Sequence, residues 1–333
     1  MFTVADARRC AVDLFMQSAI LKTQPRSSLT LDTDVLLQHF LNKPRAWLFA
    51  HDDTDISSIR KAFCAAVEQR CTGLPIAYIT GEKDFWGLPF HVSPDVLIPK
   101  PDTELLVERS LAIIREKAAA LLPEQNLFIL DPCTGSGCVA ISILHTLELE
   151  GIRNICFIAA DISPAALAIA RLNAERLLSA ETQTRLHIIE GDMRALPETI
   201  ARFEESLRLD ATPFPKAADR TSSPPLSAEY LRFDLIAANP PYVPSALTQE
   251  LLKDGRNEPA LALDGGSDGL DFIRILTNNT PMVLHDCGGL LSEVGEYHAQ
   301  DASRLFETAG FSAVRIHQDW TNRDRLIEGV LHG

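Results

Sequence analysis

Apolar residues near the N-terminus recur at the spacing of an amphipathic helix. They fall at Val4, Ala7, Ala11, Leu14 and Phe15. Residues three or four apart share one helix face, and similar helical stretches occur over 34–41 and 59–67. Gly-Leu-Pro at 73–75 ends the pattern. We therefore predict a small all-helical domain over residues 1–73.

Residues 74–99 have a different pattern, in which aromatic and β-branched positions are interleaved with glycine and proline. The first group is Tyr78, Phe85, Trp86, Phe90 and Val92, and the second is Gly81, Gly87, Pro89 and Pro94. Such a pattern is typical of a β-hairpin or an extended connector. We expect this segment to link two domains.

From residue 100 to residue 333, short β-rich runs alternate with helical runs. The β-rich runs are Leu127–Asp131, Ile155–Asp161, Leu186–Glu190, Phe233–Ala238, Gly289–Val294, Ala313–His317 and Leu326–Leu331. This alternation predicts an α/β domain with a Rossmann-like, mostly parallel seven-stranded sheet. Residues 318–325 are too few for a crossover helix, so the last strand should be antiparallel. Residues 201–230, rich in proline, serine and mixed charge, are expected to form a flexible insertion.

Composition narrows the class of protein. The chain has 333 residues, 46% of them apolar, and a formal charge of −14 that argues against binding a phosphate backbone. Its seven cysteines are scattered without disulfide or zinc spacing, which indicates a reducing cytoplasm. We recognise no signal peptide and no run of membrane-spanning length. A cytoplasmic protein with no membrane, nucleic-acid or metal partner is expected.

A glycine-rich turn follows the first predicted strand of the sheet and precedes a helix. Its residues are Cys133, Thr134, Gly135, Ser136 and Gly137. Gly135 and Gly137 leave the backbone open to a ligand, and the helix offers unpaired N–H groups. We predict that this loop binds a cofactor. With Ala140 the spacing also satisfies a loose dinucleotide pattern, so a nicotinamide dehydrogenase stays possible at this point.

Two acidic residues lie at the carboxyl ends of the next two predicted strands. Asp161 ends the second strand, where its carboxylate can accept both hydroxyls of a ribose. Ser163 and Pro164 then supply an N-cap and a first helical residue. Asp192 follows the third strand and is expected to orient the adenine end of a cofactor.

The fourth predicted strand runs directly into Asn239, Pro240, Pro241 and Tyr242. Consecutive prolines stiffen this turn and hold it at the carboxyl edge of the sheet, where α/β sheets bind ligands. If the Asn239 side-chain oxygen and the Pro240 carbonyl each accept one N–H, a planar NH₂ group is oriented for methylation. Tyr242 would pack against that flat group, so Asn239, Pro240 and Tyr242 are the candidate catalytic residues. Asn239 is also expected to contact the cofactor, and Pro241 to contact the substrate with the other three.

Several longer motifs cover most of the chain from about residue 72 onward: PIAYITGEKDFWGLPF at 75–90, VLIPKPDTE at 96–104, TGSG at 134–137, DIS at 161–163, NPPYVP at 239–244, EP at 258–259, ALDGG at 262–266 and DGLD at 268–271. Together they resemble the release factor N5-glutamine methyltransferases, a family of class I S-adenosylmethionine-dependent enzymes.

The resemblance implies a fold, a cofactor and a substrate. It implies a helical N-terminal domain that helps recognise the release factor, a β-hairpin linker and a seven-stranded methyltransferase domain that binds S-adenosylmethionine. The Asn239–Tyr242 motif would hold the glutamine of a Gly-Gly-Gln motif, whose N5 atom is methylated. Release factors are thus the expected protein partners.

Three positions depart from the pattern of the family. Lys100 replaces the usual arginine, Pro132-Cys133 replaces the usual Leu-Gly, and Met193 stands where many relatives have tryptophan. Loss of the arginine removes a planar donor fork, whereas flexible Met193 can still cover an adenine ring.

Other functions remain open from the sequence. With Cys133 and Cys138, the glycine loop is also similar to that of a sister family, which methylates a glutamine of a large-subunit ribosomal protein. These two cysteines are themselves expected to be packing residues. An adenine-N6 DNA methyltransferase would use the same clamp, but it must also grip phosphates. A catalytically silent binding module would not need both the clamp and the glycine loop. Glu293 and Glu296, near the end of the fifth strand, have no assigned role.

Overall fold

The computed structural model describes residues 1–122, 125–209 and 231–332. Contacts divide the chain into two compact units, each described by itself. The first consists of Met1–Glu82, Val92–Pro94 and Gln249–Glu258. The second consists of Lys83–His91, Asp95–Thr248 and Pro259–Gly333. Among the described residues, no helix is long and apolar enough to cross a membrane.

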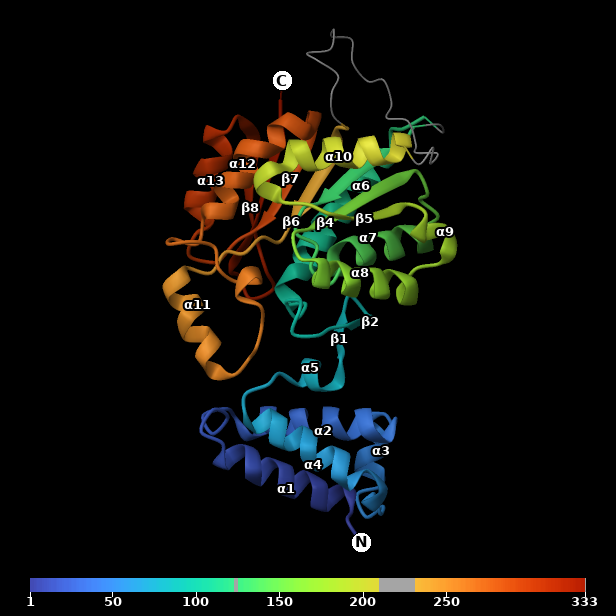
Figure 1. The fold of residues 1–333 in the computed structure, drawn as a ribbon, viewed down its shortest axis with the longest axis vertical. Helices are drawn as coiled ribbons and strands as arrows, with labels where there is room; N and C mark the ends of the chain where they lie inside the picture. The colour runs from blue at the N-terminus through green and yellow to red at the C-terminus, as the bar shows by residue number, and fades with distance from the viewer. Residues whose placement is uncertain (123–124, 210–230, 333) are drawn as a thin grey trace. The chain divides into compact units, whose positions relative to one another are not determined.

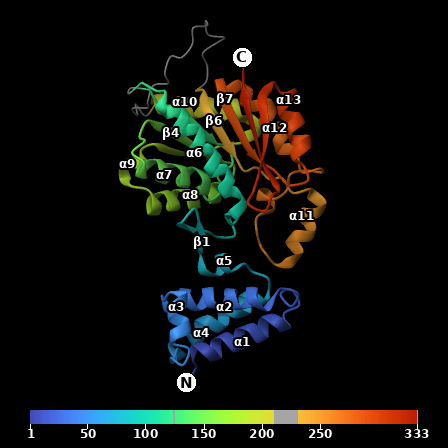
Figure 2. The same ribbon diagram turned by 180° about the vertical axis from the view of Figure 1, so that it is seen from behind.

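The first unit is helical, as predicted (Figure 1). Its elements are α1 (Val4–Gln17), α2 (Arg26–Leu41), α3 (Arg45–Ala50), η1 (Ser57–Ile59), α4 (Arg60–Cys71), α5 (Ile76–Thr80) and η4 (Leu252–Asp254). Helices α1, α2 and α4 contact one another (Figure 2). Between them they bury Phe15, Leu36 and Phe63. The fully buried Asp34 is paired with Arg8 at 2.7 Å and Arg45 at 3.0 Å, which offsets the cost of burying its charge.

A segment far along the chain completes this unit. Gly73 and Gly255 lie so close that a Cβ on Gly73 would come within 2.0 Å of the Asp254 carbonyl oxygen. A Cβ on Gly255 would meet the Thr72 carbonyl oxygen at the same distance. The backbones of 72–73 and 254–255 therefore pack directly against each other, without side chains between them.

The second unit contains a two-stranded hairpin and a seven-stranded sheet. The hairpin, β1 (Glu82–Phe85) with β2 (Leu88–His91), lies within the segment predicted to be a hairpin or connector. The sheet strands are β3 (Leu127–Asp131), β4 (Ile155–Asp161), β5 (Leu186–Glu190), β6 (Phe233–Ala238), β7 (Leu284–Glu293), β8 (Phe311–Gln318) and β9 (Asp324–Leu331). Their order is β5-β4-β3-β6-β7-β9-β8, and β9 is antiparallel to both neighbours. This confirms the predicted sheet, although the last three strands begin earlier than predicted, β7 at Leu284, β8 at Phe311 and β9 at Asp324.

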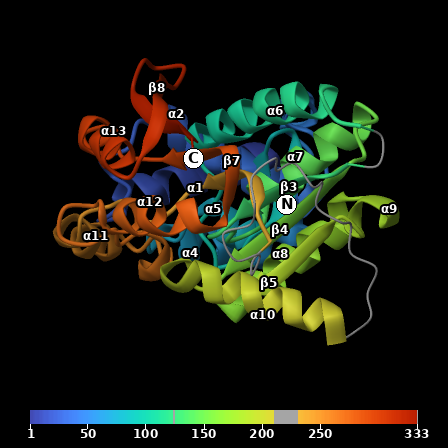
Figure 3. The same ribbon diagram turned by 90° about the horizontal axis from the view of Figure 1, so that it is seen from above.

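Helices cover both faces of this sheet (Figure 3). Helices α6 (Glu104–Ala119), α7 (Cys138–Leu149) and α8 (Pro164–Leu177) bury residues such as Val107 and Ile143 on one face. Helices α10 (Leu196–Leu209), α12 (Asp271–Val283) and α13 (Ala299–Thr308) bury Ile200, Ile273 and Phe306 on the other. The remaining short elements are η2 (Pro101–Thr103), α9 (Ala180–Gln183), η3 (Met193–Ala195), α11 (Ser245–Leu251) and η5 (Ala260–Ala262).

The predicted insertion begins later than residue 201. Helix α10 continues to Leu209, so residues 201–209 are helical rather than irregular. Ile200, Phe203 and Leu207 recur at helical spacing and pack against the core. The proline-rich composition beyond residue 210 concealed this pattern, and residues 210–230 lie outside the described part of the chain.

Candidate active site

The glycine loop connects β3 to α7 at the carboxyl edge of the sheet. Gly137 is the N-cap residue of α7 and has a φ of 80°, in the left-handed region that favours glycine. A Cβ there would lie 2.8 Å from Ile141 Cδ1, the movable end of a side chain, so the left-handed backbone is the main reason for glycine at this position. At Gly135, by contrast, a Cβ would meet no atom within 4 Å. The backbone at Gly135 is therefore exposed to an open cavity.

This cavity is a pocket in the second unit that brings together most of the predicted cofactor residues. Cys133, Thr134, Gly135, Ser136, Asp161, Asp192, Met193 and Asn239 all line it. Gly137 is not part of the lining, and the loop geometry gives it a conformational role. Lys100 and Met193, two of the departures from the family pattern, lie in the pocket wall.

Asp161 braces the glycine loop. Its Oδ2 accepts a hydrogen bond from the Gly135 N–H at 2.8 Å, and its Oδ1 accepts one from the Ser163 N–H at 2.9 Å. Burial raises the pKa of this carboxyl above its ordinary value, against the effect of these hydrogen bonds. Ser163 caps α8, with its side chain accepting from the Ala166 N–H at 3.2 Å, and Pro164 is the first helical residue, as predicted.

Sequence reasoning did not identify Asp131, a second acid in the pocket wall. It is the last residue of β3, and its Oδ1 accepts a hydrogen bond from the Cys133 N–H at 3.2 Å. Burial raises the pKa of Asp131 to about 7. Its position at the carboxyl end of a buried parallel strand was the available signal.

An apolar patch forms another part of the pocket wall. Met193 is buried in η3 and belongs to a cluster with Ala238, Leu276 and Phe272. Asp192 caps η3, and its Oδ1 lies 2.9 Å from the Nε atom of Arg194. Met193 is thus placed to cover a flat apolar ring, while the Asp192 carboxylate is already shared with Arg194.

The predicted clamp begins directly after β6. Asn239 and Pro241 line the pocket, whereas Pro240 and Tyr242 are not part of its lining. The Asn239 Nδ2 atom donates to Thr103 Oγ1 at 3.0 Å. The Tyr242 hydroxyl donates to Glu293 Oε1 at 2.9 Å.

The segment around the ALDGG motif forms backbone hydrogen bonds with the residue that follows the clamp. The Val243 N–H donates to the Leu263 carbonyl at 2.9 Å, and the Gly265 N–H donates to the Val243 carbonyl at 2.8 Å. A Cβ on Gly265 would lie 2.7 Å from the Tyr242 Cα, so only glycine allows this close approach. The motif at 262–266 therefore fixes the backbone of the clamp.

Cys133 and Cys138 both line the pocket, and their thiols are not ionised. Burial raises the pKa of the Cys133 thiol well above its usual range and that of Cys138 to about 12. Thiols with such pKa values stay protonated, and the thiolate is the reactive form. The Asn239 backbone lies close to the Cys133 thiol and slightly offsets the rise of its pKa, so the clamp and the glycine loop are neighbours.

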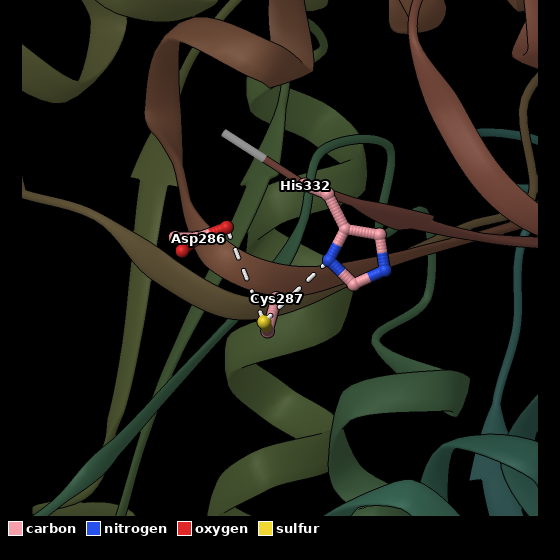
Figure 4. A group of neighbouring side chains, drawn as sticks. All are labelled: Asp286, Cys287 and His332. Atoms are coloured by element: carbon pink, nitrogen blue, oxygen red, sulfur yellow. Dashed lines mark hydrogen bonds between the residues drawn. The ribbon is translucent and has the colours of Figure 1, made fainter.

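A separate cluster of metal-ligating residues lies on the surface. The side chains of Asp286, Cys287 and His332 converge, with their ligand atoms within 4.8 Å of one another (Figure 4). None of the three lines the pocket. The position of this cluster does not test the prediction that methylation needs no metal.

The fold and the pocket define the class of this protein. A mostly parallel sheet with an antiparallel strand near its end, a glycine loop after its first strand and an acid ending its second make it a Rossmann-like α/β protein with a ligand pocket at the carboxyl edge of the sheet.

Comparison with known proteins identifies the family. A family model described as the PrmC N-terminal domain matches residues 16–81. The release factor glutamine methyltransferase of Vibrio cholerae is 32% identical over 331 residues, covering 98% of this chain and 96% of that protein. That of Xylella fastidiosa strain 9a5c is 35% identical over 306 residues, covering 91% and 94%. That of Clostridium acetobutylicum is 31% identical over 306 residues, covering 91% of each. This chain belongs to the release factor glutamine methyltransferase family.

Proposed function

We propose that this protein transfers a methyl group from S-adenosylmethionine to N5 of the glutamine in the Gly-Gly-Gln motif of peptide chain release factors. One observation carries the proposal: the Asn239 clamp and the glycine loop border the same pocket. A methyl donor bound on the loop and an amide held by the clamp would thus meet at the carboxyl edge of the sheet. The named relatives act on release factor glutamine, which favours this substrate.

The pocket residues fit S-adenosylmethionine. The open backbone at Gly135 leaves room for a ligand, and Asp161 offers an ionisable acceptor for ribose hydroxyls. Met193 and Phe272 offer an apolar surface for the adenine ring. When bound, the cofactor supplies an electrophilic methyl group on a positively charged sulfur.

In the proposed reaction, the protein chiefly orients a weak nucleophile. An amide nitrogen shares its lone pair with the carbonyl, so it must be held with that lone pair aimed at the methyl carbon. Asn239 Oδ1 and the Pro240 carbonyl would accept its two N–H bonds and stabilise the positive charge that develops there. A nitrogen–carbon bond forms, the carbon–sulfur bond breaks, and the nitrogen then loses one proton to solvent.

The other parts of the chain receive proposed roles. Residues 1–73 would help recognise the release factor, residues 74–99 would link the units, and residues 100–333 would carry out methyl transfer. We also propose that the protein acts in the cytoplasm, where release factors work, and needs no direct nucleic-acid or membrane partner.

A labelling experiment tests the proposal. The purified enzyme is incubated with labelled S-adenosylmethionine and, separately, with release factor, large-subunit ribosomal protein and duplex DNA. We expect label on the glutamine of the release factor, and no label when that glutamine is replaced by alanine. Label on the ribosomal protein or on DNA alone would refute the proposed substrate.

A further inference from the structure

A connected set of buried polar groups lies behind the clamp and outside the predicted catalytic set. Thr103, in η2, and Glu293, at the end of β7, are each only 1% exposed. Thr103 Oγ1 accepts from Asn239 Nδ2 at 3.0 Å, and the Thr103 hydroxyl lies close enough to the Glu293 carboxylate to lower its pKa. Glu293 Oε2 is buried and has no hydrogen-bond partner among the described residues, so the Thr103 hydroxyl is the donor placed to serve it. The Tyr242 hydroxyl donates to the same carboxylate at 2.9 Å. Both side chains of the clamp therefore converge on Glu293, one of them through Thr103.

The chemistry of these groups gives the set a direction. When Glu293 is ionised it can only accept hydrogen bonds, so the Tyr242 hydroxyl donates to it and the adjacent Thr103 hydroxyl turns its proton toward it. With its single proton committed, the Thr103 oxygen can only accept from Asn239. The Asn239 carboxamide must therefore turn its NH₂ group inward to Thr103. Its oxygen is left for the pocket.

That orientation matters because a carboxamide has two ends of similar shape and opposite hydrogen-bonding character. An oxygen facing the pocket can accept an N–H of the target amide, whereas an NH₂ group there would repel it. We propose that Thr103 and Glu293 are positioning residues that fix the Asn239 carboxamide with its oxygen toward the methyl-accepting amide. This inference rests on the proposed function.

A role in packing alone does not account for this arrangement. A buried carboxylate is costly unless its partners compensate, and an apolar residue would fill the end of β7 at lower cost. Arg325 and Asp102 also act on Glu293 with opposite charges, so its environment contains no single dominant counter-ion. An acid is needed here because one side chain must accept from two hydroxyl groups, those of Tyr242 and Thr103.

Two substitutions at Thr103 separate the hydroxyl from the shape of the side chain. Thr103→Val keeps the volume and removes the acceptor, whereas Thr103→Ser keeps the hydroxyl. We expect Thr103→Val to lower kcat for release factor methylation by roughly 10- to 100-fold with unchanged affinity for S-adenosylmethionine. Thr103→Ser should stay within about threefold of wild type. The matched control is Thr280→Val, which removes another fully buried hydroxyl, bonded to the Leu276 carbonyl in α12 at 2.8 Å.

Glu293→Gln tests the direction of the hydrogen bonds. Glutamine presents one oxygen and one NH₂ group, so it can accept from only one of the two hydroxyls. If the NH₂ group of the new glutamine faces Thr103, the Thr103 hydroxyl accepts from it and points its own proton at Asn239. The Asn239 carboxamide then flips, with its oxygen toward Thr103 and its NH₂ group toward the pocket. We expect kcat to fall as in Thr103→Val, again with unchanged cofactor affinity.

A double-mutant cycle with Asn239→Ala gives the decisive comparison. If Thr103 acts through Asn239, Thr103→Val should cause no further loss of kcat in the Asn239→Ala background. Equal losses of kcat in both backgrounds, or a Thr103→Val single variant as fast as the Thr280→Val control, would overturn the inference.

A readout that needs no substrate separates this inference from the proposed function. In wild type the Asn239 side-chain NH₂ protons should exchange slowly by NMR, because one is bonded to Thr103. Thr103→Val should make that exchange faster, and unchanged exchange would overturn the inference. A wild-type enzyme that shows slow exchange but does not methylate release factor would refute the proposed function alone.

Discussion

Replacement of Asp161 by alanine is expected to weaken cofactor binding by an amount that follows from the hydrogen bonds of its carboxylate. Oδ2 already accepts from the Gly135 N–H and Oδ1 from the Ser163 N–H, at 2.8 and 2.9 Å. Each carboxylate oxygen has two lone-pair sites, so each retains one for a ribose hydroxyl. Loss of these charge-assisted bonds should cost roughly 1.5–3 kcal/mol. This corresponds to a Kd for S-adenosylmethionine about 10- to 150-fold higher.

Calorimetric titration with S-adenosylhomocysteine and with its 2′,3′-dideoxy analogue separates two effects of the substitution. Both ligands need the glycine loop that Asp161 braces, but only the first offers ribose hydroxyls. The Asp161→Ala variant should therefore lose much more affinity for the hydroxylated ligand than for the analogue. Asp161→Asn should also bind poorly, because its NH₂ end would face one of the two backbone N–H donors.

Two results would refute this reasoning. Unchanged affinity of Asp161→Ala for S-adenosylhomocysteine, with folding confirmed by thermal unfolding, would remove Asp161 from the binding site. Equal losses for the two ligands would mean that Asp161 acts only by holding the loop.

Three further predictions follow from the clamp, the units and the buried acid. Asn239→Ala should still bind S-adenosylmethionine but lose roughly 10²-fold or more in kcat, whereas Asn239→Asp, which keeps an acceptor oxygen, should retain partial activity in the same radiolabel assay. Near-normal methylation by the alanine variant would contradict the clamp. Deletion of residues 1–73 should leave calorimetric cofactor binding intact, because every pocket residue belongs to the second unit, but should slow methylation of intact release factor. A truncated enzyme as fast as the full chain would exclude a recognition role for that segment. Finally, burial raises the pKa of Glu293 from 4.5 to about 7, so the folded state holds a proton that the unfolded state loses between these values. The free energy of unfolding should therefore fall as pH rises from 4.5 to about 7 and then level off. Urea unfolding at pH 5 and pH 8 measures this fall, and it should be roughly 3 kcal/mol smaller in Glu293→Gln than in wild type. An equally steep fall in the glutamine variant would assign the effect to other groups.

The same acid predicts a pH dependence of activity with the opposite sign. Only ionised Glu293 forces Thr103 to donate to it, so kcat for methylation should decline as pH falls below about 7. The titratable or charged groups that act on Glu293 are Tyr242, Asp102 and Arg325. A stopped-flow pH profile with no step in the wild type, or with the same step in Glu293→Gln, would contradict this assignment.

Sequence patterns predicted the central strands well because of how they are buried. Strands β3, β4, β5 and β6 have the predicted bounds, and β3 and β6 are buried throughout, so each has a continuous apolar run. The first half of β7 was missed because 285–287 is polar or exposed and Cys287 has a φ of 61°. Local apolar periodicity carries no information about such a segment.

Sequence patterns indicated those parts of the candidate site that lie within single loops. The glycine turn and the predicted clamp each occupy one short stretch, and residues of both line the same pocket. The bond between Thr103 and Asn239 joins residues 136 positions apart, and only the folded sheet brings them together. Burial of Asp131 and Glu293, which raises their pKa values, is likewise a property of the tertiary structure.

The composition of the first unit has a consequence for how the chain is made. Residues 249–258 pack against 72–73 through bare backbone, yet a ribosome produces them only after most of the methyltransferase sheet. During synthesis, the helices α1–α4 can form early because their contacts are local. The backbone around Gly73 stays exposed to solvent until residues 249–258 leave the ribosome. The N-terminal unit therefore cannot be completed before residues 249–258 have been made, which is after strand β6 and before strands β7, β8 and β9.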